Sequence, residues 1–183
     1  MINKEAIPRK NATLYKTHKV GTPVRLLTTG CNSAIENLSR FIEAICAPLT
    51  ENMQGRIKNT QELLNIIDDL NQKELPNNTL LVSFDIVSMF PSIDNDNGVK
   101  AVEEFLDQRK TLSHKTECII EGLKICLFNN NSKFDNQHLL QTNGTATGAP
   151  NSCSYADIAV SSIDKKVFIS MSTSYKELIY YGR

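Results

Sequence analysis

The segment Thr79–Val87, with the sequence TLLVSFDIV, constrains the fold of this chain more than any other. Its apolar and β-branched residues predict a β-strand, and its composition predicts that the strand is buried. Asp85 nevertheless stands inside it. Because burial of an unpaired carboxylate costs several kcal/mol or more, Asp85 needs either a basic partner or a metal ion beside it.

The composition is that of an ordinary folded domain. The chain has 183 residues, of which 40% are hydrophobic, enough for one domain or part of a larger one. No run of about 18 apolar residues is present, so we expect no membrane span. The N-terminus is polar, without the apolar core of a signal peptide. We therefore expect an intracellular protein, with the nucleus as one option.

The five cysteines are scattered along the chain and odd in number. They show no Cys-x-x-Cys spacing, which argues against both a zinc site and a disulfide framework. The sequence instead predicts reduced cysteines in the core.

The zero net charge hides an asymmetry along the chain. Residues 1–30 hold six basic residues and one acidic residue, whereas residues 61–121 hold five basic and twelve acidic residues. A basic segment that faces an acidic one is compatible with phosphate binding beside a metal site. Chance clustering and solvated helix faces explain the same numbers, so both interpretations stay open.

The remaining patterns predict an α+β domain, with helices packed on one face of a small antiparallel sheet. Thr60 is a candidate N-cap, and Pro48 marks a helix end or a kink. Hairpins are expected to turn near Gly21 and near Asn136, and the final residues ELIYYGR are typical of the start of a strand. Helices are expected over residues 34–49, 61–70, 98–109, 114–128 and 154–168.

Asp85 is placed near the end of the predicted strand, where the chain enters a turn that contains Pro91. The Asp85 carboxylate and the Ile86 carbonyl oxygen are hard ligands of the kind that Mg²⁺ prefers. An aspartate that pairs with an arginine or caps a helix is the alternative at this point.

Two further segments offer groups for phosphate binding. In residues 143–157, NGTATGAPNSCSYAD, a glycine-rich turn opens a helix and can present backbone N–H groups to a phosphate or a base. In residues 15–30, a predicted hairpin carries Lys16, Lys19 and Arg25, which together suit a triphosphate. An ordinary loop before a helix and a solvated basic loop are the alternatives.

Taken in order, these segments resemble the motifs of reverse transcriptases, most closely those of Penelope-like retroelements. KTHKVGTPVRLLTTG is similar to the fingers motif, TLLVSFDIVSMFPSI to the palm motif with the first catalytic aspartate, and NGTATGAPNSCSYAD to the following loop and helix. The resemblance extends from about residue 8 to the end. It implies a right-hand polymerase with fingers over about residues 1–78 and an incomplete palm over residues 79–183.

The resemblance also implies a role for each matching residue. Asp85 and the Ile86 carbonyl would hold magnesium, and two such metal ions would assist nucleotidyl transfer. Phe90 would be the steric gate that favours deoxynucleotides. Arg25, with Lys16 or Lys19, would bind the triphosphate, and the sequence does not decide between the two lysines. The loop that contacts the templating pair and the nucleotide would comprise Thr147, Gly148, Ala149 and Pro150.

The implied activity is RNA-directed DNA polymerisation, with an RNA template, a DNA primer, deoxynucleoside triphosphates and Mg²⁺ as partners and no membrane. The family's second carboxylate motif, Tyr-x-Asp-Asp, is absent from these 183 residues. The pair Asp68–Asp69 lies on a predicted helix instead. We therefore expect this polypeptide by itself to be inactive.

Thr147, Cys153 and Asp157 depart from the residues that relatives have at these positions. These departures leave open a nucleic-acid-binding remnant without enzymatic activity. A third option is an intracellular domain whose motif matches are accidental. The oligomeric state, the template and the priming mode are open at the level of sequence.

Overall fold

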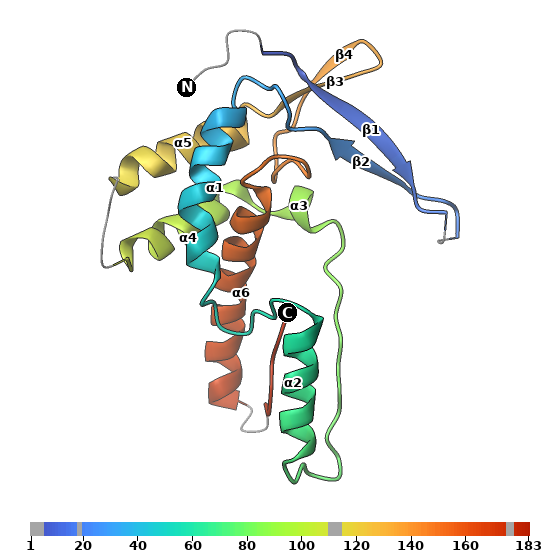
Figure 1. Cartoon of the computed structure of the whole chain (residues 1–183), viewed down its shortest axis with the longest axis vertical. Helices are drawn as coiled ribbons and strands as arrows, with labels where there is room; N and C mark the ends of the chain where they lie inside the picture. The colour runs from blue at the N-terminus through green and yellow to red at the C-terminus, as the bar shows by residue number, and fades with distance from the viewer. Residues whose placement is uncertain (1–5, 18–19, 110–114, 175–177) are drawn as a thin grey trace.

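The computed structural model describes residues 6–17, 20–109, 115–174 and 178–183. Figure 1 shows a four-stranded sheet that extends from a body of helices. The strands are β1 (Arg9–Tyr15), β2 (Val24–Thr28), β3 (Asn131–Phe134) and β4 (Gln137–Leu140). The helices are α1 (Glu36–Thr50), α2 (Thr60–Asn71), α3 (Met89–Ser92), α4 (Asn95–Asp107), α5 (Thr116–Phe128) and α6 (Ser152–Ser174).

The sheet has the strand order β2-β1-β3-β4 and is built from the two predicted hairpins. The pairs β1–β2 and β3–β4 are antiparallel, as expected. The pair β1–β3 is parallel, so the expectation of a wholly antiparallel sheet is wrong at this pairing. Turn residues fix the register within a hairpin, but no local signal fixes how two hairpins meet. The sheet contains strands from both sides of the predicted boundary between residues 78 and 79. The division into a fingers part and a palm part at this boundary stays a prediction.

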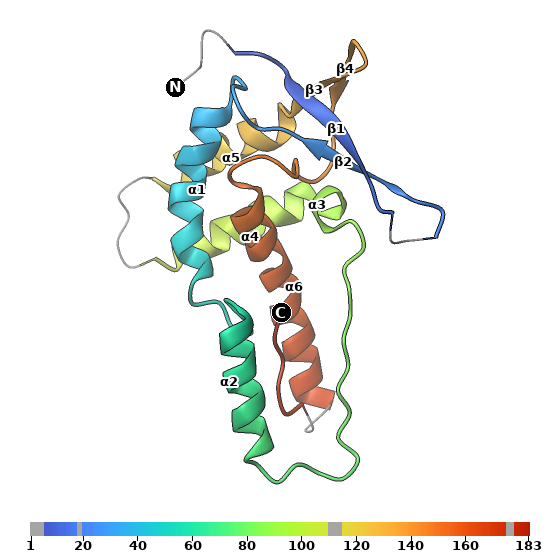
Figure 2. The same cartoon turned by 45° about the vertical axis from the view of Figure 1, so that its right-hand side comes forward.

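The core lies among α1, α4, α5 and α6, which pack together beside the sheet (Figure 2). Apolar residues at helical spacing supply it, among them Ile42, Val102, Leu123 and Ile158, all at most 1% exposed. Pro48 does not end α1, which continues to Thr50.

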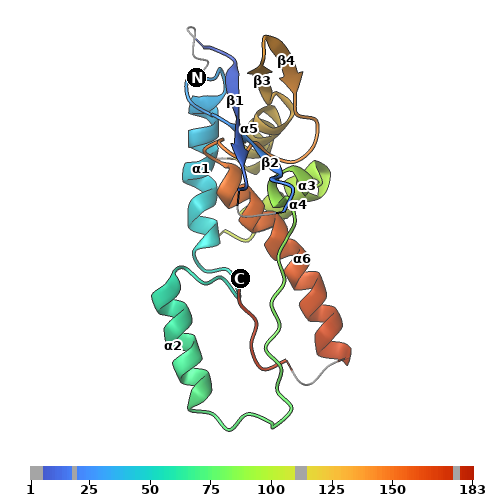
Figure 3. The ribbon, with the colours of Figure 1, turned by 90° about the vertical axis from the view of Figure 1, so that its right-hand side faces the viewer.

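The α2 helix contributes nothing to this core, because none of its residues is buried. Figure 3 shows it apart from the other helices. Its N-cap is Asn59, one residue before the predicted Thr60, and the Asn59 side chain accepts a hydrogen bond from the Glu62 backbone N–H at 2.9 Å. Asparagine and threonine are both favoured at an N-cap, so the sequence pattern does not distinguish Asn59 from Thr60.

We expect Asn59→Ala to loosen α2 selectively, because the helix has little tertiary packing to compensate for a lost cap. The local cost is about 1 kcal/mol, the usual effect of removing such a cap. Amide hydrogen exchange across α2 should speed up while exchange in α5 stays the same. Unchanged exchange in α2 would contradict the role of Asn59.

The predicted buried strand over Thr79–Val87 is not formed. The segment is extended but has no strand partner among the described residues, and it is exposed throughout, with Phe84 at 92%. Figure 3 shows it as a long connection between α2 and α3. The β-propensity of a sequence measures how well it fits a sheet, and a strand also needs a neighbour to bond with. The final residues 178–183 form no assigned strand either.

All five cysteines are free thiols, as expected. Cys46 and Cys126 lie in the core, where burial raises their pKa to about 12 and about 11. The other three, Cys31, Cys118 and Cys153, are exposed, so the expectation of core cysteines is wrong for them. Within the described ranges, no helix has the length and apolar character needed to cross a membrane.

Candidate functional site

Three segments that lie far apart in the sequence meet beside the end of β2. Thr29, just after β2, forms an isolated parallel bridge with Gly148 of the loop before α6. The backbone N–H of Thr145 in the same loop donates to the Phe90 carbonyl at 3.0 Å. The structure thus brings together parts of all three motifs that the sequence singled out.

Two glycines allow this close approach. Gly144 has φ +67°, and a Cβ there would collide with the Phe90 carbonyl oxygen and lie 2.6 Å from the Pro91 Cα. A Cβ at Gly148 would collide with the Thr28 carbonyl oxygen. Since glycine has no Cβ, the loop backbone can lie directly against both neighbouring segments.

The loop is held on the first turn of α6 by buried hydrogen bonds. The hydroxyls of Thr145 and Ser152 are 2.7 Å apart, and the Ser152 hydroxyl donates to the Ala146 carbonyl at 2.5 Å. The backbone N–H groups of Ala149 and Ser152 donate to Ala146 and Ala149 carbonyls. These two N–H groups are therefore occupied within the loop, and a phosphate would need other donors than the sequence pattern indicated.

A chain of polar side chains links the loop to the sheet. The Gln141 amide donates to the carbonyls of Asn143 at 2.8 Å and Thr145 at 3.2 Å, and its oxygen accepts from the Asn130 amide at 2.8 Å. Asn130 in turn accepts from the Arg9 guanidinium at 2.5 Å. Arg9 is 2% exposed, and burial lowers its pKa. Sequence reasoning missed this network, because no spacing connects residues so distant in the chain.

Five of the predicted site residues lie at or beside the meeting point, and Lys16 lies just after β1. Phe90, Thr147 and Pro150 are half-buried, Ala149 is buried and Gly148 is exposed, all at or beside the meeting point. Lys16 is half-buried just after β1, where its backbone N–H donates to the Pro23 carbonyl at 3.0 Å.

The triphosphate-binding cations are described only in part. Lys19 lies outside the described residues. The Arg25 backbone pairs with Leu14 in the β1–β2 ladder, but its side chain is likewise outside the described part of the structure. The choice between Lys16 and Lys19 therefore stays open.

Asp85 and Ile86 are not brought into this group. Both are exposed on the extended segment that leads to α3. Asp85 therefore carries no burial cost that a basic partner or a metal ion would have to offset. In the part of the chain that is described, no group of three or more His, Cys, Asp or Glu residues is arranged to hold a metal ion. The assignment of Asp85 and the Ile86 carbonyl as magnesium ligands therefore stays a prediction.

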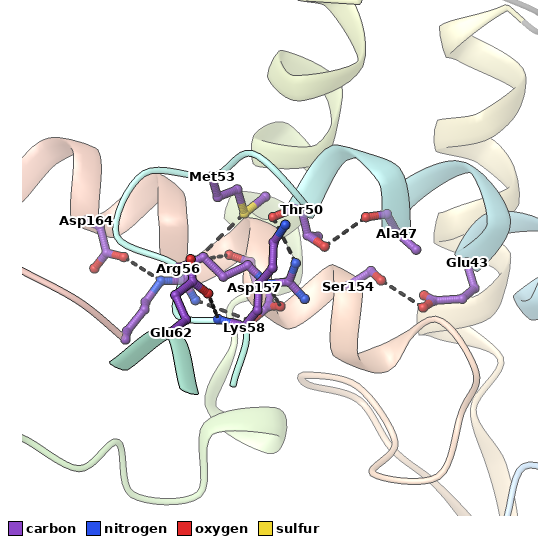
Figure 4. A network of polar contacts seen from close by, with 11 residues as sticks. Glu43, Ala47, Thr50, Met53, Arg56, Lys58, Glu62, Ser154, Asp157 and Asp164 are labelled. Atoms are coloured by element: carbon purple, nitrogen blue, oxygen red, sulfur yellow. Dashed lines mark hydrogen bonds and ion pairs between the residues drawn. The ribbon is translucent and has the colours of Figure 1, made fainter. Parts of the chain in front are cut away.

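Asp157, which departs from the usual motif, lies in an ion-pair cluster on α6 (Figure 4). Its carboxylate lies 3.3 Å from the Arg183 guanidinium and 3.8 Å from that of Arg56. Arg183 also pairs with Asp164 at 2.8 Å and exchanges two backbone hydrogen bonds with Gly55 and Ile57, at 2.7 and 2.8 Å.

The sequence contains one signal for this cluster. Asp157 and Asp164 are seven residues apart, so they share one face of a helix and can bind the same cation. In this structure Asp157 pairs with two arginines, Arg56 and Arg183, so it has a structural role.

No protein-family model and no curated protein matches the sequence. Among solved structures, the fold is similar to that of an apo telomerase from Candida tropicalis, truncated from its C-terminal domain, with a TM-score of 0.61. The two chains are 15% identical, and the match covers 95% of this chain and 42% of that one. At this identity the likeness concerns the fold. The chain therefore has a reverse-transcriptase-type polymerase fold, with fingers-like and palm-like parts.

Proposed function

We propose that this chain forms the fingers and the N-terminal palm of an RNA-directed DNA polymerase of the Penelope-like kind. One observation supports this function above all: the end of β2, the short helix α3 at Phe90 and Pro91, and the loop at Gly144–Gly148 meet at one place. These are the segments whose sequences resemble the fingers, palm and loop motifs. The fold likeness agrees with the proposal.

In this function the meeting point positions an incoming nucleotide. The Phe90 backbone is fixed against the loop by the bond from Thr145. In the proposed function its ring would lie next to the sugar of the nucleotide. A ring there would exclude a ribose 2′-OH and favour deoxynucleotides. The loop at Thr147–Pro150 would lie against the templating pair, and Lys16 would approach the triphosphate from the hairpin. Such positioning is a large part of catalysis in phosphoryl transfer.

Magnesium, when bound, would stabilise the charge that develops on the phosphoryl oxygens. Asp85 and the Ile86 carbonyl would hold it only together with a further carboxylate. Among the described residues, no group of three or more His, Cys, Asp or Glu side chains is arranged to hold a metal ion. We therefore expect the 183-residue polypeptide to bind primer–template without extending the primer.

Two assays on the same sample test this expectation: primer extension on an RNA template with Mg²⁺ and deoxynucleotides, and fluorescence anisotropy with the labelled primer–template. We expect binding and no extension. Asp85→Ala, with Asp68→Ala on the exposed face of α2 as the matched control, checks any product that does form. Extension lost only in Asp85→Ala would disprove the inactivity, whereas absence of both binding and extension would disprove the proposed function.

A nucleic-acid-binding remnant is the second candidate, favoured by the solvent-exposed position of Asp85 on the extended segment before α3. The two candidates differ in their response to nucleotides. A polymerase site predicts that the deoxynucleotide complementary to the template raises the affinity for primer–template, and that a mismatched one does not. A remnant predicts no difference between the two nucleotides.

A further inference from the structure

Arg9 is a cation in the interior of the protein, at 2% exposure. Its Nη1 atom donates to the Asn130 side-chain oxygen at 2.5 Å. Its Nε and Nη2 atoms are buried without a hydrogen-bond partner, and none of the ion pairs among the described residues includes Arg9. Because a buried charge without an opposite charge is costly, stability alone does not explain an arginine at this place.

The hydrogen bond from Arg9 fixes the direction of the two side-chain amides that follow it. An arginine side chain can only donate hydrogen bonds, so the Asn130 oxygen must face Arg9 and the Asn130 NH2 group must point away from it. That NH2 group donates to the Gln141 side-chain oxygen at 2.8 Å. The Gln141 NH2 group must then point onward, so a chain of donors leads from Arg9 to the loop before α6.

The backbone holds Gln141 next to Asn130. The Gln141 backbone N–H donates to the Asn130 carbonyl at 3.2 Å, which continues the β3–β4 ladder past the pair of Asn131 and Leu140. A main-chain bond and a side-chain bond therefore join the same two residues. Asn130 is 2% exposed and Gln141 is half-buried, so water has little access to the bonds between them. The direction set by Arg9 is thus passed on through two hydrogen bonds.

The two donors of Gln141 brace the turn at Gly144. They reach the Asn143 carbonyl at 2.8 Å and the Thr145 carbonyl at 3.2 Å, one on each side of Gly144. Thr145 is 3% exposed, and its N–H donates to the Phe90 carbonyl at 3.0 Å. A reversed Gln141 amide would turn its oxygen towards these carbonyls and leave them without a donor, which is costly for a buried group. The turn against Phe90 therefore depends on the direction of the Gln141 amide.

We propose that Arg9 is a positioning residue for the nucleotide, because through Asn130 and Gln141 it holds the turn at Gly144 against Phe90. Arg9 acts only through these residues, since its guanidinium is buried and hydrogen-bonds to Asn130 alone among the described residues. The inference rests on the proposed function, because it takes a nucleotide as the ligand beside Phe90. Arg9, Asn130 and Gln141 all lie outside the three motif segments of the sequence.

The test measures how a deoxynucleotide changes the affinity of the full chain for a labelled primer–template, by fluorescence anisotropy. In the wild type, the complementary deoxynucleotide should raise the affinity and a mismatched one should not. In Arg9→Met the two nucleotides should give equal affinities, while the affinity without nucleotide stays at the wild-type value. Amide exchange at Thr145 should become about two- to tenfold faster, the effect of weakening one hydrogen bond. Urea unfolding should show at most a small loss of stability, because the cost of the buried charge disappears together with the hydrogen bond.

Arg109→Met is the matched control. The Arg109 guanidinium also has a buried Nη2 atom without a partner, but its Nε atom donates to the Leu106 carbonyl at 3.3 Å, at the end of α4. This variant should keep the wild-type response to the complementary nucleotide. Arg9→Lys keeps a cation that only donates and should restore the response. Gln141→Glu has nearly the shape of glutamine, but an ionised carboxylate cannot donate to the two loop carbonyls, so this variant should lose the response.

A wild-type response in Arg9→Met or in Gln141→Glu would overturn the positioning role while the proposed function stands. Equal losses of the response in Arg9→Met and Arg109→Met would also overturn it, since general destabilisation would then explain both. If Arg9→Met did not fold, Gln141→Glu would decide by itself. A wild-type chain that does not distinguish the two nucleotides would overturn the proposed function, and with it the role of Arg9 towards the nucleotide. Exchange at Thr145 separates the two cases, because faster exchange in Arg9→Met would still show that Arg9 holds the turn.

Discussion

Replacing Gly144 with alanine is expected to separate the loop from Phe90 and to destabilise the whole meeting point. The left-handed backbone at φ +67° costs an alanine about 1–2 kcal/mol by itself. The new Cβ would also collide with the Phe90 carbonyl oxygen, which belongs to the backbone and has little room to move. The hydrogen bond from the Thr145 N–H to that carbonyl would then break or lengthen.

Gly21→Ala is the matched control for this variant. Gly21 has φ +78°, so an alanine there has the same backbone cost, but among the described residues no atom beyond its two chain neighbours lies within 4 Å of the added Cβ. Urea unfolding should therefore show a clearly larger loss of stability for Gly144→Ala. Amide exchange at Thr145 should speed up in Gly144→Ala alone. Equal losses in the two variants would mean that the contact with Phe90 is unimportant for stability.

Arg183→Met is the second change with a large expected effect. The Arg183 side chain is 19% exposed and joins Asp157 and Asp164, so its removal takes a cation from two partly buried carboxylates. Arg56 then remains 3.8 Å from Asp157 as its other cation. Breaking a fully buried ion pair costs about 3–5 kcal/mol. Because these groups keep some contact with water, we expect a loss of about 2 kcal/mol, between that figure and the value for surface pairs.

Arg40→Met is the control, since it makes the same substitution in an ion pair at the surface. Arg40 pairs with Glu36 at 2.8 Å on α1, and its side chain is 64% exposed. Exposed helix pairs of this kind contribute little to stability. Urea unfolding of both variants measures the difference. If Arg183→Met lost no more stability than Arg40→Met, the cluster on α6 would contribute no more to stability than a surface ion pair.

Local patterns predicted most of the elements. The helices α4, α5 and α6 follow apolar spacing within one segment, and the hairpin at Asp135–Asn136 follows from turn residues that tolerate positive φ, here 45° and 60°. Each of these signals involves residues a few positions apart. The motif segments were also recognisable individually, and the structure brings parts of them together.

Features that depend on distant partners were not predictable in this way. The bond between Arg9 and Asn130 joins residues 121 positions apart, and no periodicity connects them. The segment Thr79–Val87 has the composition of a strand, but whether it pairs depends on a neighbour elsewhere. For the same reason the sequence led us to expect a buried Asp85, which in the structure lies in water.

The parallel pairing of β1 with β3 has a consequence for folding during synthesis on the ribosome. The hairpin of β1 and β2 is complete once the first 28 residues have emerged, but its neighbour β3 begins only at Asn131. At a synthesis rate of about 5–20 residues per second, roughly 5–20 s pass between the completion of this hairpin and the emergence of β3, which pairs with β1. A lone two-stranded hairpin is only marginally stable in water. The nascent chain therefore exposes an unfinished sheet until α5 and the second hairpin arrive.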